Sequence, residues 1–135
     1  MKKLMLLFAS VFVLAAVSAR AQTTASASPK TPFDGVVKFK QDAIDFGTTK
    51  YKKPVTVTFE FTNIGQKPLI IQSAQPSCGC TTPDWTRQPV MPGKEGKVTA
   101  TFNAETLGLV NKTVFVNFNG IAATKELHLR GRVVQ

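Results

Sequence analysis

The chain has 135 residues, with 17 basic and 8 acidic side chains and a formal net charge of +9. This length is typical of one domain with a core of its own, so the two cysteines are not needed as a disulfide framework. The lysines are spread along the chain, apart from "KYKK" at residues 50–53, and this argues against a nucleic-acid partner. Solubility, protection of edge strands and attraction to anionic envelope polymers account for the charge.

Residues 1–21 have the pattern of a cleaved secretory signal peptide. Lys2 and Lys3 precede the apolar run of residues 4–17, and "ARA" at residues 19–21 places the cut after Ala21. The run is too short for a membrane anchor, and no cysteine lies at the junction to carry a lipid. We therefore expect an exported protein, periplasmic or extracellular, without a membrane span or lipid anchor.

Residues 22–34, "QTTASASPKTPFD", are predicted to form a flexible leader, and residues 35–135 a single domain. From there the hydrophobic period is two. In "VTVTFEFT" the side chains of Val55, Val57, Phe59 and Phe61 fall on one side, which predicts a strand with one buried face.

The same alternation recurs along the rest of the chain. It is found in "KVTATF", "KTVFVNF" and "ELHLRGRV", with shorter apolar pieces at "VVKF", "AIDFG" and "PLIIQSA". Asn119–Gly120 predicts a hairpin turn, and no window shows helical spacing. About seven short strands predict an immunoglobulin-like antiparallel β-sandwich, here without an inter-sheet disulfide because both cysteines share one loop.

The stretch "QPSCGCTTPDW", residues 75–85, holds the only two cysteines, Cys78 and Cys80. A disulfide between them is possible if the backbone bends at Gly79, the residue that bends without steric penalty. Such a small ring is strained and easily reduced, and an oxidising compartment favours its closure.

Four interpretations of this loop remain open: an inert turn, a partner-contact site, a soft-metal site and a catalytic dithiol. Cys78 and Cys80 could hold Cu(I) with Met91 or His128 as a third donor, and two protomers could supply four thiolates. A catalytic thiolate needs a helix N-terminus, a histidine or a cation nearby, and Arg87 is the one neighbouring cation in the sequence. We expect no cofactor and no catalytic residue.

Three other side chains carry candidate roles. Trp85 is expected to cover one end of the sandwich rather than to form a ligand platform. His128 is expected on the solvent side of the last strand, and Asp84 in a turn before Trp85.

The stretch from Ala43 to Trp85, with "MPGKEGKVTATFNAETLGLVNKTVFVNFN" and the terminal "LRGRV", resembles the bacterial family called domain of unknown function 1573. That family is common in exported Bacteroidetes proteins and is similar to the immunoglobulin-like ASH/MSP/Hydin modules. The resemblance implies an envelope module for binding or scaffolding. It also implies a distinctive surface at Cys78, Gly79, Cys80 and Thr81, with Trp85 as a further candidate.

Two functions follow from these observations. The first is a non-catalytic binding module that recruits another envelope protein, or a second copy of itself, through an exposed edge strand. The alternative is a thiol-based carrier of Cu(I) or electrons that uses Cys78 and Cys80.

Overall fold

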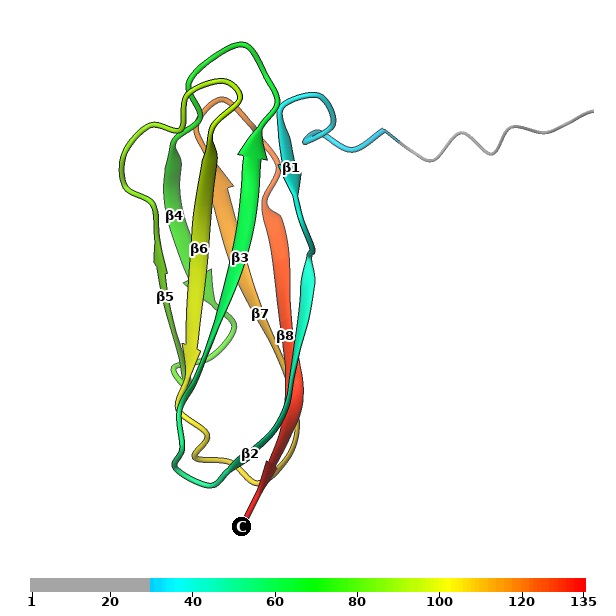
Figure 1. Ribbon diagram of the computed structural model, residues 1–135, viewed down its shortest axis with the longest axis vertical. Coiled ribbons are helices and arrows are strands. Elements are labelled where there is room, and N and C mark those ends of the chain that lie inside the picture. Colours follow the sequence, from blue (N-terminus) through cyan, green and yellow to red (C-terminus); the bar gives the residue numbers. More distant parts are fainter. Residues whose placement is uncertain (1–29) are drawn as a thin grey trace, which may run out of the picture.

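The computed structural model describes residues 30–135, so the predicted signal peptide and most of the predicted leader lie outside the described residues. The described chain forms eight strands in two layers (Figure 1). Their bounds are β1 Val37–Phe39, β2 Ala43–Lys50, β3 Val55–Asn63, β4 Ile71–Pro76, β5 Thr81–Trp85, β6 Glu95–Phe102, β7 Gly108–Phe118 and β8 Lys125–Val134. Within residues 30–135, no helix has the length and apolar character needed to cross a membrane.

The predicted immunoglobulin-like sandwich is confirmed. One sheet has the strand order β1-β3-β6-β5 and the other the order β2-β8-β7-β4. These correspond to the two sheets of a constant-type immunoglobulin domain, with the first strand divided between them. The strand missing from the sequence prediction is β5, because it is only five residues long and contains Pro83, which a central strand would not accept.

The expected antiparallel pairing holds for every strand pair except β2 with β8, which are parallel. The chain pairs β1 with β3 in the first sheet and then crosses to the second, where β2 lies beside the last strand. A parallel pair needs a long connection between its strands, and here the rest of the domain supplies it. Sequence periodicity contains no information on this direction.

The core lies between the two sheets and follows the predicted alternation. The inward side chains of β3, β6, β7 and β8 are buried, and they include Phe59, Phe61, Val98, Ala100, Phe102, Val114, Val116, Phe118, Leu127, Leu129 and Val133. Phe61 and Phe118 meet edge to face across the sheets, with ring centroids 5.5 Å apart. Phe33, assigned to the leader by sequence, also packs on Phe118 with a centroid distance of 6.5 Å.

The two ends of the sandwich carry different loops (Figure 1). The β3–β4, β5–β6 and β7–β8 connections gather at the upper end, where the described chain also begins. The β2–β3 and β6–β7 connections and the C-terminus gather at the lower end. The two lower connections are bonded to each other, because the amide of Lys52 donates to the carbonyl of Ala104 over 2.9 Å.

Candidate functional site

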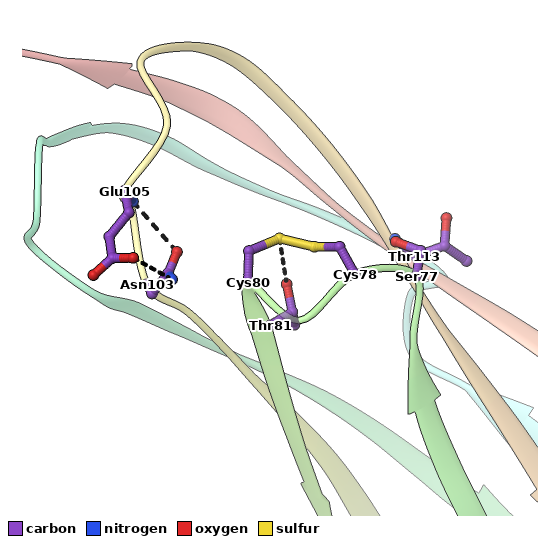
Figure 2. The surroundings of a disulfide bond; sticks show 7 residues. All are labelled: Ser77, Cys78, Cys80, Thr81, Asn103, Glu105 and Thr113. Carbon is purple, nitrogen blue, oxygen red and sulfur yellow. Dashed lines mark hydrogen bonds between the residues drawn. A yellow bond between two sulfur atoms is a disulfide. The ribbon is translucent and has the colours of Figure 1, made fainter.

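Cys78 and Cys80 form a disulfide that closes a turn of three residues (Figure 2). Their α-carbons are 5.3 Å apart, within the usual range for a disulfide. Both cysteines are partly exposed, and Cys80 packs against the edge of the core. The turn joins β4 of one sheet to β5 of the other, so the disulfide lies where the chain crosses between the layers.

Hydrogen bonds attach each side of this turn to a different sheet. The amide of Ser77 donates to the carbonyl of Thr113 on β7 over 2.8 Å. The Ser77 hydroxyl accepts from the Thr113 amide over 3.1 Å. On the other side, the carbonyl of Cys80 accepts from the amide of Asn103, which follows β6, over 3.0 Å. The Asn103 side chain in turn accepts from the amide of Glu105 (Figure 2). The turn therefore has a fixed position relative to both sheets.

Gly79 does not adopt a backbone conformation reserved for glycine. Its φ is not in the left-handed region, unlike that of five other glycines of the described chain. A β-carbon built on Gly79 would have no heavy atom within 4 Å. The bend that closes the disulfide is thus open to other residues, contrary to the sequence expectation.

Pro76 and Pro83, on either side of the turn, face the open edges of the sandwich. Ser77 is hydrogen-bonded to β7, so the neighbouring Pro76 points its backbone away from β7. Thr86 is hydrogen-bonded to β6, and Pro83, three residues earlier, likewise points away from β6. A proline in this position has no amide to offer a further strand, so both edges beside the disulfide are protected against strand addition.

The third donors suggested for a metal do not lie beside the cysteines. Met91 precedes β6, whereas the disulfide turn meets the other end of β6, about 24 Å away at the usual rise per residue. His128 lies two strands from Ser77, about 10 Å away at the usual spacing. Its Nδ1 is 3.0 Å from the hydroxyl of Thr113. Residues 30–135 contain no group of three or more metal-ligating His, Cys, Asp or Glu side chains.

Trp85 lies at the far end of β5 from the cysteines, about 17 Å along the strand. It pairs with Val98 in the middle of β6, so it covers the side of the sandwich and not one end. The Arg87 guanidinium lies 3.7 Å from the Trp85 ring centroid. Asp84, which is in β5 and not in a turn, accepts from Arg87 over 3.0 Å. This hydrogen bond, followed by one from the Trp85 amide, lowers the pKa of the Asp84 carboxyl.

A second surface, which sequence analysis missed, lies on the outer side of β7 and β8 at the lower end. We call it the Leu109 face and define it by Leu109, Arg130, Arg132 and Val134 of these strands, together with the exposed Leu107, which directly precedes β7. Leu109 is 81% exposed and pairs directly with Arg132. Four of the six large hydrophobic side chains exposed in residues 30–135 lie at this end: Tyr51, Leu107, Leu109 and Val134.

A shallow hollow of about 540 Å³ adjoins this face. It is lined by Asp45, Gly47, Thr48, Leu109, Val110, Asn111, Arg130, Gly131 and Arg132. The paired strands β7 and β8 form the floor of the hollow. Its far side is formed by the segment of β2 between Asp45 and Thr48, where the register of the pairing with β8 shifts. The Asp45 carboxylate accepts from the Gly47 amide over 2.7 Å and holds this irregularity in shape.

The sequence contains one signal for this face. In "LGLV", residues 107–110, Leu109 is out of phase with the inward residues Val110, Val114 and Val116 of the same strand. Once the register of β7 is known, Leu109 must point into solvent.

The two packed sheets and their strand orders define a module of the immunoglobulin-like class. The chain belongs to the family described as protein of unknown function (DUF1573), whose model matches residues 37–133. No curated protein sequence matches it significantly.

Solved structures agree on the fold. A protein of unknown function from Porphyromonas gingivalis W83 is similar with a TM-score of 0.63 and 17% identity, over 73% of this chain and 46% of that one. This chain thus spans about half of that protein. An ASH/PapD-like domain of human CEP192 has a TM-score of 0.59 and 16% identity, over 85% and 96% of the two chains. Part of the secreted serine protease VesC from Vibrio cholerae is also similar, with a TM-score of 0.58, 11% identity and coverage of 76% and 24%.

Proposed function

We propose that this domain is a non-catalytic binding and scaffolding module of the cell envelope, and that it docks a partner protein on the Leu109 face. The proposal rests on one observation. Of the six exposed large hydrophobic side chains of residues 30–135, Leu107, Leu109 and Val134 belong to the face that carries Arg130 and Arg132, and Tyr51 lies at the same end of the sandwich. Exposed apolar side chains rimmed by polar ones are a common feature of interaction sites. Tyrosine and arginine are also enriched at such interfaces.

Docking on a face accounts for the structure better than addition of a strand. β4 and β5 have prolines on their open sides, and β1 has only three residues. The remaining edge, β2, is interrupted between Asp45 and Thr48. Short edges, prolines and bulges are the usual protections against strand addition. The location in the envelope rests on the signal pattern of residues 1–21.

Site-specific photo-crosslinking in the native host tests this function. A photoreactive amino acid at Leu109 is expected to give one discrete adduct, which Arg132→Glu suppresses. The same amino acid at Gln72, exposed on the neighbouring strand β4 beside the opposite end of β7, is the matched control and should give none. Equal labelling at both positions, or none at Leu109, would remove the Leu109 face as the docking site.

A further inference from the structure

Arg130 and Arg132 form a pair on the outer side of β8. They are alternate residues of one strand, so their side chains leave the same face about 7 Å apart. Arg130 pairs with Asn111, and Arg132 with Leu109. The two guanidinium groups therefore border the hollow on the side next to the exposed leucine.

Neither arginine forms an ion pair within residues 30–135, although Asp45 is the strand partner of Arg130. The third arginine of residues 30–135, Arg87, forms an ion pair with Asp84, and Lys40 and Lys125 also have carboxylate partners. Arg130 and Arg132 form no ion pair in the described part of the chain, although the carboxylate of Asp45 also lines the hollow. Two guanidinium groups thus remain available to a carboxylate from another molecule.

We propose that the Leu109 face binds an acidic, apolar peptide segment of the partner, with its carboxylates held by Arg130 and Arg132 and its apolar side chains against Leu107 and Leu109. This inference rests on the proposed function and adds the chemistry of the partner. A guanidinium group presents two parallel N–H donors to a carboxylate, and such charge-assisted pairs are among the strongest hydrogen bonds in proteins.

Charge and apolar area together favour a peptide over other ligands. An anionic polysaccharide would satisfy the arginines but would leave Leu107, Leu109 and Val134 without apolar contacts. A second copy of this chain is also disfavoured by charge. Three of the 17 basic residues lie in the predicted signal peptide, so 14 basic residues face 8 acidic ones in the remainder. Two such domains repel each other, whereas an acidic segment is attracted.

Selection from a phage-displayed library of short random peptides tests the inference on the purified protein. Selected peptides are expected to be rich in Asp and Glu together with Leu or Phe. The best of them should bind Arg130→Gln/Arg132→Gln at least about 10-fold more weakly. Its affinity for the unmodified protein should fall as salt is raised. Lys67→Gln/Lys94→Gln changes the net charge equally at the upper end and should leave affinity unchanged.

Each contrary result is distinct. Neutral or basic selected peptides, no enrichment, or equal binding by the arginine variant would overturn the inference. Dextran sulfate binding that needs the arginines but is indifferent to Leu109→Ser would assign the face to an anionic polymer instead. If one of these results is obtained but the photo-adduct at Leu109 is still formed, the proposed docking function is retained and only the acidic character of the partner is refuted.

Discussion

The ring of Phe46 on β2 fills the space in which a β-carbon of Gly131 on β8 would lie. A β-carbon built at position 131 would approach three atoms of that ring more closely than carbon atoms can. The Phe46 ring is stacked near Phe102 of the opposite sheet, with centroids 6.1 Å apart. Because Gly131 has no side chain, the ring of Phe46 on the edge strand β2 can extend over β8 and pack against the core.

Gly131→Ala should destabilise the domain by about 1–3 kcal/mol, because the added methyl group forces Phe46 out of its site. Urea unfolding followed by circular dichroism measures the change. Gly79→Ala is the matched control and should be close to neutral, since its β-carbon meets nothing. In the background of Phe46→Leu the cost of Gly131→Ala should shrink, and an unchanged cost would contradict the proposed contact.

Asn63→Ala should cost about 1–3 kcal/mol, since the buried amide of Asn63 holds two loops at the upper end together. Its Nδ2 donates to the carbonyls of Lys67 and Val90, both over 2.7 Å, and its Oδ1 accepts from the Gly65 amide over 3.0 Å. Thermal unfolding reports the loss of stability. Asn111→Ala, an exposed position on β7, is the control. An effect no larger than that of the control would show that these bonds contribute nothing net.

Cys78→Ser/Cys80→Ser should cost only about 1.5 kcal/mol, because a disulfide across a three-residue loop removes little entropy from the unfolded chain. The fold should persist, as the backbone bonds of Ser77 and Cys80 already attach the turn to both sheets. Chemical unfolding of the variant and of the reduced protein measures this loss in the free energy of unfolding. The photo-adduct at Leu109 should also survive.

The thiol-based alternative predicts the opposite behaviour for this pair. If mild reductant exposed both thiols in the folded protein and they then bound Cu(I), the carrier function would regain support. Thiol alkylation before and after reduction, read by mass spectrometry, separates the two outcomes. A pair that resists reduction in the native protein and takes up no Cu(I) would leave the disulfide as a structural link.

Arg87→Ala should raise the pKa of Asp84 toward its ordinary value of 3.8, because the Arg87 hydrogen bond is the main cause of its lowered pKa. A carboxyl with a lowered pKa stabilises the fold above its unfolded pKa, and this contribution is lost as pH falls through the folded value. Carboxyl-detected NMR titration of Asp84 measures the shift. The effect on stability at neutral pH should be small, since the pair is exposed. An unchanged titration in Arg87→Ala would refute the ion pair in solution.

The alternation of hydrophobic and polar residues predicted the fold well for strands that have one solvent-exposed and one buried face. Phe59 and Phe61, Val98 and Ala100, and the inward residues of β7 and β8 were all identified in this way. The alternation of hydrophobic and polar residues carries no information on whether two paired strands run in the same direction. The parallel pairing of β2 with β8 was therefore missed. Nor does it reveal short edge strands such as β5, in which Pro83 has the signature of a loop.

The candidate site was only partly accessible from sequence. The sequence allowed a disulfide between Cys78 and Cys80 on the condition that the backbone bends at Gly79, and it left the other interpretations of the loop open. The positions of Trp85, Met91 and His128 relative to the cysteines depend on which strands are neighbours, and that information is tertiary. The Leu109 face was missed because an outward leucine beside an inward valine becomes recognisable only once the register is fixed.

The parallel pairing of β2 with β8 also determines how the domain responds to a mechanical pulling force. The described chain begins at the upper end and finishes at the lower end (Figure 1). A force that pulls the start of β2 and the end of β8 apart therefore slides β2 along β8, so that the bonds between these strands are stretched together instead of opening one after another. A tether between two separated attachment points would gain from this geometry, since rupture then requires the whole row of bonds to fail at once.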